Sequence, residues 1–319
     1  LSLYIFTTIL AITISLSVGN ILDPGSAVSV VSEEKILNIN SPPSIGSVFL
    51  NIIPENPFKS LVEGDMLQII FFAILFGGCM ASIKQNKVLL DIVFKLNDLV
   101  LKMLEVLMKI APLGIFCLIA KTFSSQGIDS ILELLKYFIG VVIVLFIHLF
   151  VVYLPLVKLI AKVNIINFFS GLKQALLFAF STSSSSATIP ITLNNLEKSF
   201  NVKKKVSSFT VPLGATINMD GTAIMQGMAT IFIANFYGIE LIFTDFLTII
   251  LTAALASIGT AGVPGVGMIM LGMVLNQVGL PLEGIAIVMG VDRLLDMLRT
   301  SLNVAGDATV TLLINKLEK

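Results

Sequence analysis

Residues 291 to 307 read VDRLLDMLRTSLNVAGD, and they concentrate ionisable side chains in a chain that is otherwise strongly apolar. Successive residues of an α-helix are about 100° apart, so the polar side chains of this stretch fall within an arc of roughly 80°. These side chains are Asp292, Asp296, Arg299, Asn303 and Asp307. The stretch therefore predicts a helix that carries one polar stripe.

The composition is that of a membrane protein. Of the 319 residues, 56% are hydrophobic and 13% are charged, and the mean hydropathy is +0.98. We expect an all-α polytopic membrane protein, in which a charged side chain at bilayer depth costs at least about 2.5 kcal/mol. The polar stripe should therefore face protein, ions or a substrate. The net charge is zero, which gives no electrostatic reason to expect a nucleic-acid partner.

The first part of the chain predicts ordinary spans and one loop. Residues 1–24 are apolar from the first position and lack a basic region, which predicts part of a transmembrane helix rather than a signal peptide. Residues 25–45 are polar, which predicts an extracellular loop. Residues 46–125 predict an apolar span that ends at a cytoplasmic lysine pair and a long helix kinked at Pro112. The polar SSQGIDS of residues 124–130 is expected to separate that helix from the next span.

Two later segments are interrupted in their middle. Residues 164–200 hold two short apolar halves around STSSSSAT, with lysines on both flanks. A single crossing would put a lysine triplet outside the cell, whereas a re-entrant hairpin from the cytoplasmic side keeps it inside. Residues 243–280 repeat the pattern around ASIGTAGVPGVG with acidic flanks, which suits a hairpin from the outside. Two opposed re-entrant helical hairpins predict an inverted-repeat transporter with its site between them.

Each interruption offers a different chemistry. The serines at 183–186 can satisfy exposed backbone at a tip, and a half-helix that begins there directs free N–H groups at an anion. The glycines of residues 259–267 allow a tip that can move and whose carbonyls bind a hard cation. The alternatives are a serine-rich loop outside the membrane and a glycine packing kink. Asn218 and Asp220 lie in a span that we expect to be unwound, and their oxygen donors favour an alkali cation.

The cysteines and the histidine point to no cofactor. Cys79 and Cys117 lie in apolar runs without paired spacing, so we interpret them as small core residues rather than as a disulfide or a metal site. His148 could be a proton relay, although a lone histidine packed between helices is the favoured interpretation. The serine run has no base nearby in its motif, which argues against an enzyme, and a channel would need a continuous pore.

Four motifs carry a family resemblance: AFSTSSSSATIPITL, PLGATINMDGTA, ASIGTAGVPGVG and VDRLLDMLRTSLNVAGD. Together they resemble the dicarboxylate/amino acid:cation symporter family, the glutamate and aspartate transporters. The resemblance implies eight transmembrane segments, two opposed hairpins and a homotrimer whose transport domains move like elevators. It also implies that the chain lacks the first two segments. Residues 46–125 would form the scaffold and trimerisation helices, and residues 1–24 with 126–319 the transport domain.

The resemblance also implies how the substrate is held. Arg299 would bind the side-chain carboxylate of the substrate by a bidentate contact, and Asp296 would bind its α-ammonium. Family members for neutral amino acids lack this arginine and those for C4-dicarboxylates lack this aspartate, so L-glutamate or L-aspartate is favoured over both alternatives. The implied substrate-binding residues are Ser184, Ser185, Met219, Thr222, Val263, Gly267, Asp296, Arg299, Thr300 and Asn303.

For the coupling ions, the resemblance implies three sets of oxygen ligands. One sodium ion would lie between Gly214, Asn218, Asn303 and Asp307, and a second would be held by Thr216, Ser257, Ile258 and Thr260. A third would use Tyr4, Thr7 and Thr8 with Asn218 and Asp220. Sodium is favoured, and proton coupling is the alternative. We expect a multi-pass protein of the plasma membrane, the inner membrane in a bacterium.

One position departs from the family pattern. Family members usually carry a second arginine, either in the serine tip or one turn before the substrate arginine, but here those positions are Ser183 and Met297. Arg293 lies one turn before Met297 on the same helix face. We hypothesise that Arg293 supplies the missing charge near the serine tip.

Overall fold

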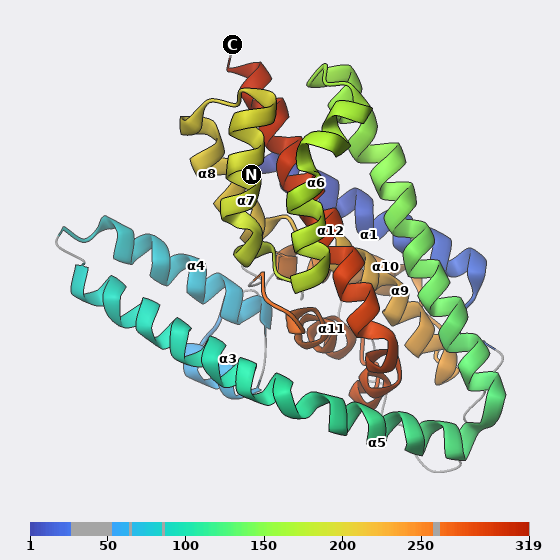
Figure 1. Ribbon diagram of the computed structural model, residues 1–319. Helices are drawn as coiled ribbons and strands as arrows, with labels where there is room; N and C mark the ends of the chain where they lie inside the picture. Colours follow the sequence, from blue (N-terminus) through green and yellow to red (C-terminus); the bar gives the residue numbers. More distant parts are fainter. Residues whose placement is uncertain (27–52, 64–65, 85–86, 258–261, 319) are drawn as a thin grey trace.

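The computed structural model describes residues 1–26, 53–63, 66–84, 87–257 and 262–318, and in these ranges the chain is helical without a strand (Figure 1). The helices are, in order, α1 (Ser2–Leu22), α3 (Pro57–Glu63), α4 (Met66–Ser82), α5 (Lys87–Ile147), the π-helical turns η1 (His148–Tyr153) and η2 (Leu156–Ile160), α6 (Ile165–Thr182), α7 (Ser185–Phe200), α8 (Lys204–Ile217), α9 (Asp220–Phe236), α10 (Phe243–Ser257), α11 (Val266–Gln277), the short η3 (Leu282–Gly284) and α12 (Ile285–Leu317).

Helix α12 forms the centre of the fold. It packs against α5, α6, α7, α8 and α9, and Figure 1 shows it running through the main body. From Leu302 to Leu313 every side chain is buried. A helix that is buried on all sides belongs to a core, and the small Ala305, Gly306 and Ala308 let neighbouring helices approach closely. The predicted polar stripe therefore continues into a half-helix that other helices enclose on all sides.

The serine stretch joins two antiparallel helices, α6 and α7, which pack against each other. The chain reverses at Ser183, whose φ of 52° is left-handed, and Ser184 is the N-cap of α7. This confirms that the serines form the tip of a helical hairpin. Helix α6 is by length and composition able to cross a membrane. The re-entrant path thus stays a prediction that rests on the flanking lysines.

The glycine stretch lies between α10 and α11, which also pack together. Ile258, Gly259 and Thr260 fall outside the described residues. Gly265 precedes α11 with a φ of 81°, a left-handed conformation that glycine adopts without strain. A tight start of this half-helix is therefore built into the glycine sequence.

The NMDGT motif is unwound, as its sequence predicts. Helix α8 ends at Ile217 and α9 begins at Asp220, while Asn218 and Met219 have non-helical backbone angles. Such a break frees backbone carbonyls and N–H groups, which buried protein tolerates where the break lines a site. The break lies beside the middle of α12.

Helix α5 differs from the sequence expectation. It is continuous over 61 residues, so SSQGIDS is helical rather than a connection. Pro112 lies inside the helix as expected, and the kink there stays a prediction. The only strong helix breaker in SSQGIDS is Gly127, which costs about 1 kcal/mol in a helix interior. The expected boundary between scaffold and transport parts, at 125/126, thus falls within a helix. In Figure 1 this helix changes direction between its teal first half and its green second half.

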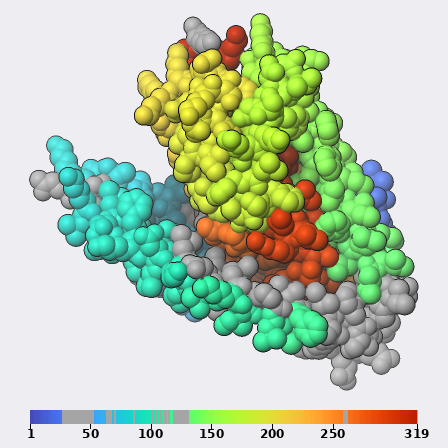
Figure 2. Space-filling view, in the orientation of Figure 1, coloured from blue at the N-terminus to red at the C-terminus, as the bar shows by residue number. Residues whose placement is uncertain are grey.

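The first half of α5 lies with α3 and α4 along one side of the main body in Figure 2, and α4 packs against α10 of that body. The exposed side chains of this half of α5 are largely apolar, among them Phe94 and Phe116. Cys79 and Cys117 are free but exposed, so the interpretation as core residues was wrong. The physical reason is that the lipid-facing and buried faces of membrane helices have similar composition, which an apolar run cannot distinguish.

Three described helical segments are long and apolar enough to cross a membrane, namely Ser2–Leu22, Ile131–Ile160 and Ile165–Thr182. Large apolar side chains such as Phe146 and Phe150 are exposed on them. Exposed apolar area of this extent suits a hydrocarbon environment rather than water. The fold is therefore that of an integral membrane protein.

The close crossing of α9 and α12 makes a stability prediction. A Cβ atom on Gly221 would lie 2.7 Å from the backbone oxygen and 2.9 Å from the Cα of Arg299. Gly221→Ala should therefore push the two helices apart and destabilise the protein by about 1–3 kcal/mol. The measurement is the thermal unfolding midpoint in detergent. Gly78→Ala is the control because nothing lies within 4 Å of a Cβ there; equal midpoints for the two variants would contradict the packing argument.

Candidate substrate and cation site

The stripe of α12 is organised around one buried guanidinium. Arg299 is 1% exposed, and its Nη2 donates to Asp292 Oδ1 at 2.7 Å and to Asp296 Oδ1 at 3.0 Å. Residues three and seven apart lie on one helix face, so the sequence spacing itself brings the three side chains together. The one guanidinium is thus paired with the carboxyl groups of both aspartates. The predicted single polar stripe is confirmed.

Two hydrogen-bond donors of the Arg299 guanidinium are not used within the described residues. Arg299 Nε and Nη1 are buried and have no hydrogen-bond partner among the described residues. Buried donors without partners are unfavourable by about 1–3 kcal/mol or more, so a ligand that accepts from them gains affinity. The rigid fork of arginine matches a carboxylate. A Cβ on Gly267 would lie 3.4 Å from Nη1, so the glycine brings the second hairpin close to this group.

Between the hairpin tips, the break in α8–α9 and α12 lies a cavity of about 20 Å³. The predicted substrate residues line it, except Ser184 and Arg299, which instead bond to the lining residues Gly262 and Asp296. Sequence reasoning gave Ser183, Gly262 and Val266 no substrate contact, although each adjoins a predicted residue. The lining comprises Ser183, Ser185, Met219, Thr222, Gly262, Val263, Val266, Gly267, Asp296, Thr300 and Asn303.

The two tips touch each other over this cavity. Ser184 Oγ donates to the Gly262 carbonyl oxygen at 2.7 Å, and the Ser186 N–H donates to the same oxygen at 3.2 Å. A Cβ on Gly262 would come within 3 Å of Ser186 and of the Ala215 carbonyl, so only glycine fits. A volume of about 20 Å³ holds little more than one water molecule. A larger ligand therefore enters only after a tip moves.

Both half-helices direct their N-termini at the cavity. Helix α7 begins at Ser185 and α11 at Val266, and both residues line it. Free N–H groups and the positive end of the helix dipole favour an anion there. Asp296, which accepts from the Gly265 N–H at 3.3 Å, adds a carboxylate to the same cavity. The site thus offers positive groups for carboxylates and a negative group for an ammonium.

The residues predicted to bind the first cation lie close together. Asn218 Nδ2 donates to the Asn303 carbonyl and to Asp307 Oδ1, both at 3.0 Å. Asn218 Oδ1 is buried without a partner among the described residues. A side chain on Gly214 would overlap the Asp307 carboxylate. An orphan amide oxygen beside a buried carboxylate is a donor set that fits a hard cation.

The residues predicted to bind the third cation also lie close together. Thr8 Oγ1 lies 2.5 Å from Asp220 Oδ1, and the hydroxyls of Thr7 and Thr8 reach the Tyr4 carbonyl oxygen. These residues and Asn218 are buried. All the donors are oxygen atoms, which again suits an alkali cation.

The second cation set is described only in part. Thr216 lies in the last turn of α8 and Ser257 ends α10, whereas Ile258 and Thr260 lie outside the described residues. Among the described residues, no group of three or more His, Cys, Asp or Glu side chains lies close enough to hold a metal ion. The candidate cation sites therefore depend on carbonyl, amide and hydroxyl oxygens as much as on carboxylates.

The sequence analysis did not predict two side chains that contact Asp220. His148 Nε2 lies 3.0 Å and the Tyr153 hydroxyl 2.6 Å from Asp220 Oδ2, and all three residues are fully buried. The favoured interpretation of His148 as a packed histidine agrees with this position. Its partner could not be foreseen, since the contact spans 72 residues of sequence in a run of apolar residues.

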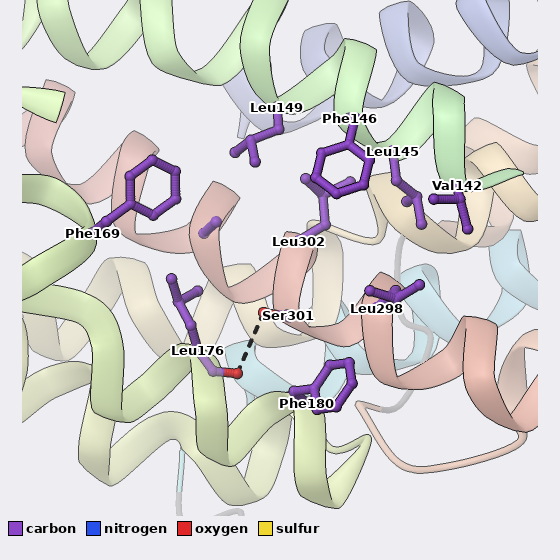
Figure 3. A pocket seen from close by; sticks show the side chains of 11 residues that line it. Val142, Leu145, Phe146, Leu149, Phe169, Leu176, Phe180, Leu298, Ser301 and Leu302 are labelled. Carbon is purple, nitrogen blue, oxygen red and sulfur yellow. Dashed lines mark hydrogen bonds between the residues drawn. The ribbon is translucent and has the colours of Figure 1, made fainter. Parts of the chain in front are cut away.

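An apolar cavity on another side of α12 is separate from this site. It measures about 150 Å³ and lies between α5, α6 and α12, with Phe146, Phe169 and Leu302 among its walls (Figure 3). Ser301 points its hydroxyl to the Leu176 carbonyl oxygen at 3.3 Å. The cavity lining has no charged side chain, so it offers nothing to an amino acid.

Arg293 is exposed on α12. No hydrogen bond or ion pair from its side chain to a described residue is formed. The hypothesis that it supplies charge to the serine tip stays a prediction.

Comparison with known proteins agrees with this architecture. The model of the sodium:dicarboxylate symporter family matches residues 1–317. The proton/sodium-glutamate symport protein of Geobacillus stearothermophilus is 37% identical over 323 residues, which cover 98% of this chain and 76% of the relative. The proton/glutamate-aspartate symporter of Escherichia coli K12 is 34% identical over 98% of this chain and 74% of its own length. The human excitatory amino acid transporter 1 is 40% identical over 79% of this chain and 47% of its own length.

The fold and the comparisons define a membrane transporter, not an enzyme. The chain belongs to the sodium:dicarboxylate symporter family.

The contact between the tips predicts how the site opens. Ser184→Ala removes the hydroxyl that bonds to Gly262 and should raise the rate at which a thiol reagent labels Val263→Cys, in a background without Cys79 and Cys117. One lost buried hydrogen bond corresponds to a roughly twofold to tenfold faster labelling. Ser181→Ala is the control, since the Ser181 hydroxyl bonds only to Phe178 on its own helix. Equal rates for both variants would mean that the tip contact does not hold the site closed.

Proposed function

We propose that the protein is a secondary active symporter that carries L-glutamate or L-aspartate into the cell with sodium ions. The observation that carries the proposal is the Arg299 guanidinium beside the Asp296 carboxylate, since its Nε and Nη1 are buried without hydrogen-bond partners among the described residues. The bacterial relatives named above are glutamate or glutamate-aspartate symporters, which supports the substrate class.

The charges of the site select among substrates. An acidic amino acid has two carboxylates and one ammonium; Arg299 binds the side-chain carboxylate, Asp296 binds the ammonium, and the helix N-termini at Ser185 and Val266 receive the α-carboxylate. A neutral amino acid would leave the arginine donors unpaired. A C4-dicarboxylate would leave Asp296 without its ammonium. Each mismatch removes favourable hydrogen bonds and ionic contacts that the acidic amino acid makes, so both alternatives bind less tightly.

The coupling ion is the finer part of the proposal. Sodium is supported by buried oxygen atoms that lie close together, above all Asn218 Oδ1, which has no partner among the described residues, with Asp307, and Thr8 with Asp220. The Geobacillus stearothermophilus relative is named for both protons and sodium, and the Escherichia coli relative for protons. Proton coupling is thus the alternative, in which Asp220 and Asp307 carry protons instead of binding sodium.

We infer the transport cycle from the family resemblance, and the contact between the two tips supports its closing step. Sodium ions and substrate bind together, the tips close over them, and the transport part moves across the membrane against the scaffold before a tip opens on the cytoplasmic side. Sodium at Asn218 and substrate at Thr222 and Asp296 share the unwound segment and α12, so each stabilises the arrangement that the other needs. In the proposed assembly three copies form a homotrimer in the plasma membrane, and residues 46–125 supply the scaffold.

Uptake of radiolabelled L-aspartate and L-glutamate by reconstituted liposomes tests the function. We expect an inward sodium gradient to drive uptake and Arg299→Ala to abolish it, because the side-chain carboxylate loses its partner. Arg299→Lys keeps the charge but not the fork and should retain a small part of the activity. Uptake driven only by a proton gradient would overturn sodium coupling, and no uptake of either amino acid would overturn the substrate.

The Arg293 hypothesis makes a separate prediction. If Arg293 supplies charge near the serine tip, Arg293→Ala should weaken the apparent affinity for L-aspartate severalfold, and Arg293→Lys should preserve it. Both variants are compared in the same uptake assay at varied L-aspartate concentration. An unchanged affinity and rate in Arg293→Ala would refute the hypothesis while leaving the role of Arg299 intact.

A further inference from the structure

Asp220 is held on one oxygen by two donors from a single short segment. His148 Nε2 lies 3.0 Å and the Tyr153 hydroxyl 2.6 Å from Oδ2, while the other oxygen, Oδ1, faces Thr8. All four residues are buried. The carboxylate therefore has one oxygen engaged by fixed donors and one directed at the third predicted cation set.

The segment that supplies both donors is the π-helical turn η1, His148–Tyr153. In a π-helix, residues five apart are joined by a backbone hydrogen bond and lie above one another. In an α-helix they would be about 140° apart around the axis, since each residue advances about 100°. The π-helical turn is thus what lets His148 and Tyr153 meet at one atom, with their rings edge to face at 4.7 Å.

The sequence gives a reason for this turn. Pro155 follows it, and in a continuous α-helix its ring would clash with the carbonyl of Val151 and its nitrogen would donate no hydrogen bond. Room for the Tyr153 hydroxyl comes from Gly306 on α12, where a Cβ would overlap that hydroxyl. Proline on one side and glycine on the other therefore fix the position of the tyrosine.

We propose that the π-helical turn is a clamp for the Asp220 carboxylate, in which His148 and Tyr153 are positioning residues that keep Oδ1 turned to the cation. The inference rests on the proposed function for the identity of that cation. In this arrangement His148 Nε2 and the Tyr153 hydroxyl donate, and Asp220 Oδ2 accepts both hydrogen bonds.

The clamp has a measurable consequence. Loss of either donor lets the carboxylate turn and share Oδ2 with the cation, so the ion must then order the group that it binds. A hydrogen bond to a charged group is worth enough to change ion affinity about tenfold. The two donors meet at one atom, so the effects of removing each should not add.

The test uses Tyr153→Phe and His148→Phe, with Tyr137→Phe as the matched control. Tyr137 is also buried on the same stretch of chain, but its hydroxyl has no partner among the described residues. The first measurement is the sodium concentration that gives half-maximal L-aspartate uptake. We expect a rise of about tenfold for Tyr153→Phe and His148→Phe, little change in the maximal rate, and no change for Tyr137→Phe. His148→Gln, which keeps an N–H donor, should lie between.

The second measurement does not depend on the driving ion. The carboxylate stretch of Asp220 is isolated as the infrared difference between the protein and Asp220→Asn, and it should shift in Tyr153→Phe but not in Tyr137→Phe. An unshifted band, or a half-saturating sodium concentration equal to that of the control, would overturn the clamp. If transport proved independent of sodium, the proposed coupling would fail by itself, and the infrared band would still decide the role of the turn.

Discussion

The structure depends on keeping ionised groups satisfied where no water can reach them. Arg299 is paired with Asp292 and Asp296, and Asp220 with His148, Tyr153 and Thr8, all among buried side chains. In an apolar medium each unpaired charge would be prohibitive, so these groups gather in one region around α12. The broken helices follow from the same constraint, because only a buried polar region tolerates free backbone groups.

Local signals in the sequence were enough to predict the parts of the site. The stripe of α12, the serine tip and the unwound Asn218 and Met219 each arise from residues close in sequence, and the structure has them where they were expected. Charges that recur on one helix face and clusters of serine or glycine have few other physical explanations within an apolar chain.

Contacts between distant segments could not be predicted in the same way. The hydrogen bond between Tyr153 and Asp220 depends on a π-helical turn. An apolar run has the same sequence pattern whether it forms an α-helix or a π-helix, so the turn could not be predicted. We did not predict that α5 continues through SSQGIDS. A polar stretch often indicates a loop, but polar residues do not by themselves break a helix. We did not predict that Cys79 and Cys117 are exposed. In a membrane protein an apolar run can face lipid as well as the protein core.

The hydrogen bonds to the Gly262 carbonyl belong to both hairpins at once. Movement of either hairpin breaks the same hydrogen bonds. These bonds therefore add the same free energy to the cost of opening the site outward and to the cost of opening it inward. The contact can limit how often the site is open to either side, but it cannot choose the side. That choice must come from what each hairpin contacts on its outer surface, whereas the ion gradient sets the direction of net transport.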